Sequence, residues 1–189
     1  MRVVGGRLGG RFRGRSLAGP KSDAIRPTSD RLRETIFNIL AHGYDDPVSD
    51  ARVLDLFAGT GAMGLEALSR GATFTLFVDE SAGARGLIRE NVEALGVGGQ
   101  SRLFRRNATR LGPAAPNAPF SLVFCDPPYG KGLADKALAA CAAGGWLTTD
   151  ALVVIEEAAG AALKLPEGFA LIETRDYGEA QLVFGRFGV

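Results

Sequence analysis

The sequence predicts an α/β protein built on a doubly wound, mostly parallel sheet with helices on both faces. Two observations support this prediction. From residue 52 onward, short apolar segments typical of strands alternate with segments of helical period. Several of the strand segments are almost wholly apolar, as expected where helices cover both faces of a sheet. The 189 residues, 46% of them hydrophobic, suffice for one full-sized domain with its own core.

The expected elements follow one another in a regular order. The first helix is expected at residues 28–43, where apolar residues recur at helical spacing and Thr28, Ser29 or Asp30 can cap the start. Strands are then expected at 52–59, 73–80, 101–108, 120–126 and 151–158, with helices at 61–70, 81–96 and 133–144. Residues 171–187 form a predicted hairpin around a Tyr-Gly-Glu turn, so one edge strand is expected to run antiparallel.

Basic charge is concentrated at the amino end. Residues 1–33 hold nine Lys or Arg and two Asp, whereas the remainder holds thirteen basic and nineteen acidic residues. We therefore divide the chain into a basic arm rich in glycine and arginine (1–27), with a short hairpin, and a main domain (28–189). A basic arm on an acidic body is typical of proteins that bind nucleic acid. A solvated tail is the alternative interpretation.

Other classes of protein are disfavoured by composition. Two cysteines, Cys125 and Cys141, make neither a disulfide framework nor a metal cluster, and we expect both to be core thiols. No metal site is expected. No apolar run approaches the roughly 18 residues that span a bilayer, and the first residues lack the apolar segment of a signal peptide. The expected location is the reducing cytoplasm.

The segment DLFAGTGAMG, residues 55–64 and hereafter the glycine loop, predicts a nucleotide-like cofactor. Gly59, Gly61 and Gly64 satisfy G-x-G-x-x-G between a strand and a helix, and Asp79 follows Gly59 by 20 residues. Glycines allow close approach of a ligand, and the acid can bind ribose hydroxyls. This pattern fits NAD, FAD and S-adenosylmethionine (SAM) alike. Glu80, next to Asp79, is interpreted as a solvated neighbour.

Asp55 helps to separate these cofactors. A carboxylate beside the loop would repel a pyrophosphate, whereas it would favour the ammonium and sulfonium groups of SAM. The alternative is that backbone N–H groups of the turn satisfy Asp55. Phe57 in the loop is also placed at the cofactor, and Asn107 and Ala108 lie where an adenine would rest. An ordinary turn asparagine is nearly as good an explanation of Asn107.

The segment FCDPPYG predicts the site of chemistry. Asp126, Pro127 and Tyr129 follow an apolar strand that would neighbour the first strand, and so would face the same crevice as the glycine loop. Two prolines fix the backbone and remove two donors, which leaves a surface of acceptors. Such a surface suits an exocyclic amine of a base, on which Tyr129 could stack. The alternative is a Pro-Pro turn with Tyr129 packed at its rim.

The identity of the base stays open at this point. A carboxylate offers two acceptors, which matches the ring N–H and the 2-amino group of guanine. Amine methylases of adenine and cytosine can also carry Asp here.

The chain resembles the RsmD-type methyltransferases in five segments: RVVGG, RGRSL, IRPTSDRLRETIFNIL, VLDLFAGTGAMGLEALSRGA and FCDPPYG. The resemblance runs from Arg2 to about Gly132 and more loosely beyond. It implies the Rossmann-like class I SAM-dependent methyltransferase fold, with seven mostly parallel strands and the last one antiparallel. It also implies methylation of a guanine 2-amino group in 16S rRNA, free or in an assembling small subunit. A monomer is expected because no exposed apolar seam is evident in the sequence.

The same resemblance implies roles for particular residues. SAM would contact Asp55, Gly59, Gly61, Asp79 and Asn107, and the target base would contact Asp126, Pro127 and Tyr129. The rRNA would face arginines of the arm and the first helix: Arg11, Arg13, Arg15, Arg26 and Arg31. The arm is a few residues longer than the family pattern, so which arginines face RNA stays open.

Three other functions share parts of this pattern. An amine methylase of DNA adenine or of a protein side chain would keep the fold and both motifs. An oxidoreductase that binds NAD or FAD would leave Asp-Pro-Pro-Tyr unexplained. A non-catalytic rRNA-binding assembly factor would keep the basic arm but transfer no methyl group.

Overall fold

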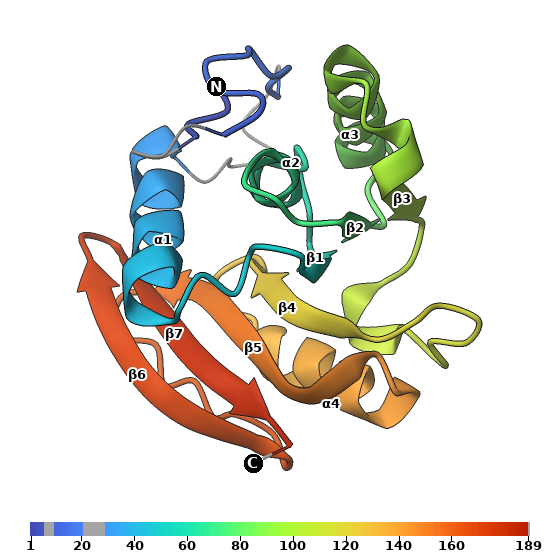
Figure 1. Cartoon of the computed structure of the whole chain (residues 1–189). Coiled ribbons are helices and arrows are strands. Elements are labelled where there is room, and N and C mark those ends of the chain that lie inside the picture. Colours follow the sequence, from blue (N-terminus) through green and yellow to red (C-terminus); the bar gives the residue numbers. More distant parts are fainter. Residues whose placement is uncertain (6–9, 21–28, 189) are drawn as a thin grey trace.

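The protein forms an α/β structure with one seven-stranded sheet, seen in a computed structural model that describes residues 1–5, 10–20 and 29–188 (Figure 1). Within these residues the strand order is β3-β2-β1-β4-β5-β7-β6. The strands are β1 Arg52–Leu56, β2 Phe74–Val78, β3 Ser101–Phe104, β4 Phe120–Cys125, β5 Leu147–Ala158, β6 Phe169–Tyr177 and β7 Ala180–Phe187. The helices are α1 Asp30–Gly43, α2 Ala62–Ser69, α3 Ala82–Leu95 and α4 Ala134–Gly144, with short 3-10 turns η1 Gly98–Gln100 and η2 Ala108–Arg110.

Two of the four described helices, α1 and α3, begin where a serine side chain caps them. Ser29 Oγ accepts a hydrogen bond from the Leu32 N–H at 3.1 Å, so α1 begins at Asp30. Ser81 caps α3 in the same way, through the Ala84 N–H at 3.3 Å. The predicted third strand is too long, because Asn107 caps η2 and the chain leaves the sheet after Phe104.

The antiparallel strand is the last one, as predicted, but its expected place at the sheet edge is wrong. β7 pairs antiparallel with both β5 and β6, so β6 forms the edge (Figure 1). Burial explains this order. The first six residues of β7 are all buried, and an apolar strand gains most from neighbours on both sides. The side chains of β6 are exposed or half-buried, which suits an edge.

Two layers of helices cover the sheet, as the apolar strands predict. The side chains of α1, α2 and α3 pack with one face, on which Leu122 and Phe124 of β4 lie. The side chains of α4 pack with the other face, together with Val123 and Cys125. Because successive residues of a strand point to opposite faces, β4 is apolar at five of its six positions, with Ser121 as the exception. Both faces of β4 therefore pack against the core.

The described part of the amino-terminal arm packs on α2 and does not extend into solvent. Arg2 and Ser16 form an antiparallel bridge, which brings two described parts of the arm together. The predicted short hairpin stays a prediction. Val3, Phe12 and Leu17 are buried in the core that includes α1, α2 and α3. The domain boundary at residue 27 stays a prediction.

A buried carboxylate joins the arm to two helices. Glu66 of α2 has no exposed surface and accepts hydrogen bonds from the backbone N–H groups of Val4 at 2.7 Å and Gly5 at 2.6 Å. It also pairs with Arg33 of α1, whose Nε lies 3.4 Å away, and with Arg70 Nε at 2.8 Å. A buried charge is tolerated only when it is paired and hydrogen-bonded in this way. The network thus fixes α1 and the arm relative to α2.

Candidate active site

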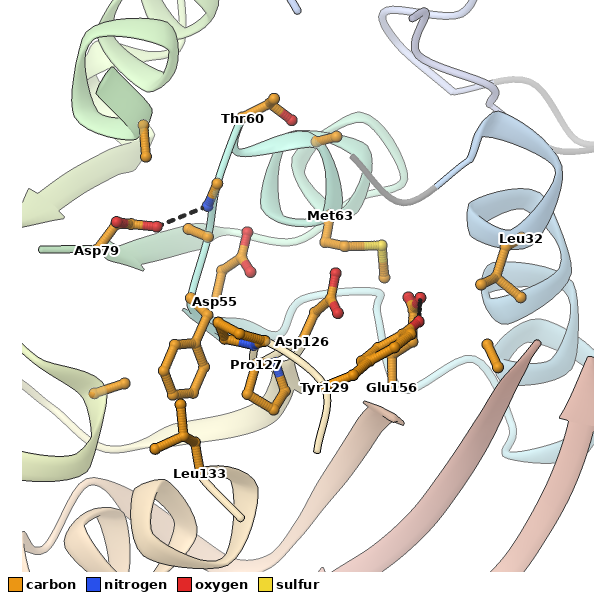
Figure 2. Close-up of a pocket in the computed structure, with 18 of the residues that line it drawn as sticks. Leu32, Asp55, Thr60, Met63, Asp79, Asp126, Pro127, Tyr129, Leu133 and Glu156 are labelled. Atoms are coloured by element: carbon orange, nitrogen blue, oxygen red, sulfur yellow. Dashed lines mark hydrogen bonds between the residues drawn. The ribbon is translucent and has the colours of Figure 1, made fainter. Parts of the chain in front are cut away.

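A cleft of about 990 Å³ opens at the carboxyl ends of β1, β2, β4 and β5 (Figure 2). This is the edge at which open α/β sheets bind their ligands. The predicted pairing of the first and fourth strands is correct, because β1 lies directly beside β4. The glycine loop after β1 and the Asp-Pro-Pro-Tyr segment after β4, residues 126–129, therefore face the same space.

Most of the residues predicted to form the site line this cleft. They are Asp55, Phe57, Gly59, Asp79, Ala108, Asp126, Pro127, Tyr129 and Arg31. Gly61, Asn107, Arg11, Arg13 and Arg15 are not in its lining. Arg26 lies outside the described residues.

The glycine loop turns sharply at the start of α2. Gly59 and Gly61 both have positive φ, 55° and 77°, where a side chain would be strained, and Gly61 is the residue that precedes α2. Phe57 also has a positive φ of 57° although it carries a side chain, and it lines the cleft. Such strained positions cluster at functional sites.

Gly64 allows α2 to approach the sheet closely. A Cβ at Gly64 would lie 2.5 Å from side-chain atoms of Phe77 and Thr75 and 3.0 Å from Asp55 Oδ2. The third glycine of the motif therefore serves helix packing.

Asp55 lies at the base of the cleft and is almost completely buried, with 3% of its surface exposed. Its Oδ2 accepts a hydrogen bond from the Gly64 N–H at 2.9 Å, in the first turn of α2. Burial raises the pKa of Asp55 to about 8, the Gly64 N–H opposes this rise, and the nearby Asp79 charge adds to it. The alternative interpretation of Asp55 is therefore correct in that a backbone N–H bonds to its carboxyl group. The same carboxyl group also lines the cleft.

Asp79 fixes the glycine loop from the end of β2. Its Oδ2 accepts a hydrogen bond from the Gly59 N–H at 3.0 Å (Figure 2). Its Oδ1 accepts one from the Ser81 N–H at 2.8 Å. A carboxylate has about four lone-pair sites, so two acceptor sites suit further donors in the cleft.

Asn107 supports the wall of the cleft from outside it. Its Oδ1 accepts from the Thr109 N–H at 2.9 Å, and its Nδ2 donates to the Glu80 carboxylate at 3.2 Å. This is the cap of a turn, so the turn interpretation accounts for its contacts. Glu80, expected to be a solvated neighbour, lines the cleft, as does Ala108.

The Asp-Pro-Pro-Tyr segment forms a corner between β4 and the next strand. The Asp126 N–H donates to the Leu56 carbonyl at the end of β1, at 3.5 Å. Tyr129 Oη lies 2.6 Å from Glu156 Oε1 of β5, and the Gly130 N–H lies 3.1 Å from Glu157 Oε1. Figure 2 shows Asp126, Tyr129 and Glu156 around the cleft.

Both cysteines are core residues, as predicted. Cys125 and Cys141 are buried, and burial raises the pKa of the Cys141 thiol to about 12 and that of Cys125 well above its ordinary value. Neither is a nucleophile at neutral pH. Trp146 is also in the core, where its Nε1–H donates to the Gly112 carbonyl at 2.8 Å. None of the groups of His, Cys, Asp and Glu in the described residues is arranged to hold a metal ion.

Arg11, Arg13 and Arg15, the arm-tip arginines, are exposed but lie at the other end of α2 from the cleft. The Arg11 N–H donates to the carbonyl of Ser69, the last residue of α2, at 2.8 Å. The Arg15 guanidinium donates to the Ala94 carbonyl at 2.7 Å, near the end of α3. Their contact with RNA stays a prediction.

The exposed cations at the cleft come from three other places in the chain. Arg31 of α1, Arg106 after β3 and Lys131 after the Asp-Pro-Pro-Tyr segment line it, and we call them the cleft-rim cations. Below them lie carboxyl groups that are buried or half-buried, including Asp55, Asp79 and Asp126.

Several lining residues were not predicted. These lining residues include Ser29, which caps α1, Leu32 and Thr35 of α1, Met63 of α2, Glu156 of β5 and residues 177–180 of the last hairpin. Only Glu156 had a usable signal in the sequence. It ends an apolar strand with two consecutive acids, as Asp79 does.

None of the helices within the described residues combines the length and the apolar character that crossing a bilayer requires.

Comparison with known proteins identifies the fold and the family. Residues 1–186 match the family described as Conserved hypothetical protein 95. The solved yhhF protein of Escherichia coli superposes with a TM-score of 0.80 at 32% identity, over 99% of this chain and 97% of that chain. The magnesium protoporphyrin IX methyltransferase of Synechocystis, solved with bound SAM, shares the fold at a TM-score of 0.61 and 16% identity, over 83% of this chain and 78% of that one. The predicted class I SAM-dependent methyltransferase fold is confirmed.

Curated relatives extend this result. The ribosomal RNA small subunit methyltransferase D of Escherichia coli K12 is 39% identical over 149 residues, which is 79% of this chain and 72% of that protein. The protein of the same name in Haemophilus influenzae is 31% identical over 173 residues, 90% of this chain and 88% of its own length. The chain therefore belongs to the family of the ribosomal RNA small subunit methyltransferases D.

Proposed function

We propose that the protein is a SAM-dependent methyltransferase that modifies the exocyclic N2 amine of a guanine in small-subunit rRNA. The observation that carries this proposal is the meeting of the glycine loop and the Asp-Pro-Pro-Tyr segment in one cleft. The names of its curated relatives support rRNA as the substrate.

The residues of the cleft fit SAM better than a dinucleotide. Asp55 is a buried carboxyl that a positively charged ligand would stabilise in its ionised form, whereas a pyrophosphate would favour no such ionisation and would meet the carboxyl group of Asp79. Asp79 keeps acceptor sites for ribose hydroxyls, and Phe57 and Ala108 supply apolar surface for a planar ring. SAM, when bound, supplies a methyl group on a positively charged sulfur.

Asp126 and the Pro127 carbonyl would hold the hydrogens of the target amine. An exocyclic amine is a poor nucleophile because its lone pair is delocalised into the ring. Hydrogen bonds to two acceptors favour a pyramidal nitrogen with a free lone pair, and most of the catalysis is then positioning and preorganised electrostatics. The Asp126 carboxylate matches guanine, because the ring N–H and the 2-amino group are two donors side by side.

The cleft-rim cations would hold the phosphates on either side of the target nucleotide. The floor of the cleft is rich in carboxyl groups, which exclude phosphates, while the three cations stand exposed at its edge. A base could therefore enter only when it is unpaired or turned out of its stack.

The proposal is tested by radiolabelled methyl transfer to small ribosomal subunits, naked rRNA, duplex DNA and protein, followed by mass spectrometry of the nucleosides. We expect N2-methylguanosine in rRNA alone. Asp126→Ala should lose about a hundredfold or more in rate, as removal of one preorganised group does, and should bind SAM normally. Methyladenine in DNA, a methylated protein, or RNA binding with no transfer by the wild type would overturn the proposal.

A further inference from the structure

Two adjacent carboxylates of β5 hold the end of the Asp-Pro-Pro-Tyr segment. Glu156 and Glu157 are the third- and second-last residues of the strand, and 9% and 4% of their surfaces are exposed. Buried glutamates are unusual, since a carboxylate loses much hydration free energy unless hydrogen bonds replace it. The hydrogen-bond partners of Glu156 and Glu157 therefore account for their burial.

Glu156 bonds the side chain of the segment's aromatic residue. Tyr129 Oη donates to Glu156 Oε1 at 2.6 Å, a distance typical of a hydroxyl bonded to a charged carboxylate. Both residues line the cleft, and Tyr129 is half-buried. The bond fixes the far end of the tyrosine ring to the strand next to the one that carries Asp126.

Glu157 bonds the backbone immediately after the same residue. Its Oε1 accepts from the Gly130 N–H at 3.1 Å and from the Ala158 N–H at 3.0 Å. Gly130 has a φ of 71°, so the chain turns here through a conformation that favours glycine. Successive strand residues point to opposite faces, so the two carboxylates reach the segment from both sides of the sheet.

Proline fixes the backbone before Tyr129, but the side-chain torsions of the tyrosine have no such restraint. A ring that could rotate freely would lose that freedom when a base stacks on it, which costs binding free energy. A ring that Glu156 already holds loses little rotational freedom when the base binds. The bond thus prepares a flat surface in one orientation before the substrate arrives.

We infer that Glu156 is a positioning residue, which orients the Tyr129 ring for the target base, and that Glu157 holds the turn that presents it. The inference rests on the proposed function. Glu156 acts through Tyr129 and has no separate role in methyl transfer.

A double-mutant cycle tests this. Tyr129→Phe keeps the ring and removes the hydroxyl, and Glu156→Ala removes the acceptor. Each should lower kcat/KM for RNA by about tenfold, the amount expected for one hydrogen bond to a charged group. The double variant should be no worse than either single variant, because both remove the same bond. Glu156→Gln, which keeps an acceptor oxygen, should recover part of the loss. The dissociation constant for SAM should not change.

The chain offers a matched control far from the cleft. Tyr44 Oη donates to Glu173 Oε1, also at 2.6 Å, and neither residue lines the cleft. Tyr44→Phe and Glu173→Ala should leave kcat/KM unchanged. Wild-type activity of Tyr129→Phe, or losses that multiply in the double variant, would overturn the inference.

A measurement without substrate separates this inference from the proposed function. Amide hydrogen exchange at Gly130 should accelerate in Glu156→Ala and in Glu157→Ala, whereas it should not change in Glu173→Ala. If exchange accelerates in these variants but the wild-type protein methylates no RNA, the proposed function is wrong. The inference that the two glutamates hold the segment would still stand. Unchanged exchange in both variants would show that the carboxylates do not hold the segment.

Discussion

Binding of SAM should tighten as the pH rises, because the buried Asp55 carboxyl keeps its proton in the free protein up to about pH 8. The cationic ligand favours the ionised form, so binding must first remove that proton when the pH is lower. The Asn variant carries no charge and accepts the same Gly64 hydrogen bond, so it should lack this dependence.

The size of the effect follows from the pKa. With a pKa of about 8, about one-tenth of the free molecules have an ionised Asp55 at pH 7 and about one-hundredth at pH 6. The affinity contributed by Asp55 should therefore fall about tenfold for each pH unit below 8 and should level off above it. The stability of the free protein has the opposite trend. Since the folded pKa lies above the ordinary value, folding holds a proton that the unfolded chain releases, and stability falls as the pH rises from about 4 to about 8.

Isothermal titration calorimetry between pH 6 and pH 9 measures this directly. The α-amino group of the ligand also titrates near pH 8, so the informative quantity is the ratio of wild-type affinity to Asp55→Asn affinity at each pH. We expect that ratio to rise about a hundredfold from pH 6 to pH 9 and the wild type to release a proton on binding at pH 7. A ratio that does not vary with pH would refute the reasoning about Asp55.

Four further predictions concern the cleft, the amino-terminal arm and the core. Replacing all three cleft-rim cations with Gln should weaken RNA binding and reduce the slope of log affinity against log salt by about 2, with SAM affinity unchanged. Reversing the charge of the arm-tip arginines should also weaken RNA binding and flatten its salt dependence; normal binding and methylation by that variant would remove the role assigned to them. Gly64→Ala should destabilise the protein by about 1–3 kcal/mol in urea unfolding, because its Cβ would collide with Phe77 and Thr75, whereas Gly86→Ala, in open space on α3, should be neutral or slightly stabilising. Thiol reagents should label Cys125 and Cys141 only after unfolding, since the raised pKa values and burial of both keep the thiolate scarce; rapid labelling of the native protein, read by mass spectrometry, would contradict this.

The parts of the fold that depend on local pattern could be predicted from the sequence. Strand β4 is apolar on both faces and β2 nearly so, and the helices show their period and their capping serines, so their existence and order follow. The pairing of β1 with β4 also followed, because the two motifs must share an edge for either to make chemical sense. The sequence pattern did not predict the inner position of β7 in the sheet. That position depends on which strand of the hairpin is apolar enough to be buried on both sides.

The site was predictable where motif residues themselves line the cleft. Asp55, Asp79 and Asp126 each follow or end a strand, and that position alone places them at the right edge. Glu156 has the same position, but only its contact with Tyr129 distinguishes it from any acid at a strand end. The position of the arm-tip arginines relative to the cleft could not be predicted for a similar reason. Their place is set by Ser69 and Ala94, far along the chain, and no local pattern encodes it.

The network around Glu66 also bears on how the chain leaves the ribosome. Val4, Gly5 and Arg33 precede this carboxylate, two of them by 62 and 61 residues, and Arg70 follows within one helical turn. Synthesis proceeds at about 5–20 residues per second from the amino end. Three of the four groups that bond or pair with Glu66 are therefore made before Glu66 itself. For β1 the order is the opposite, because its partner strand β4 is synthesised after it. The nascent chain up to Arg70 thus already holds the four described partners of Glu66, while its strands still have an open edge.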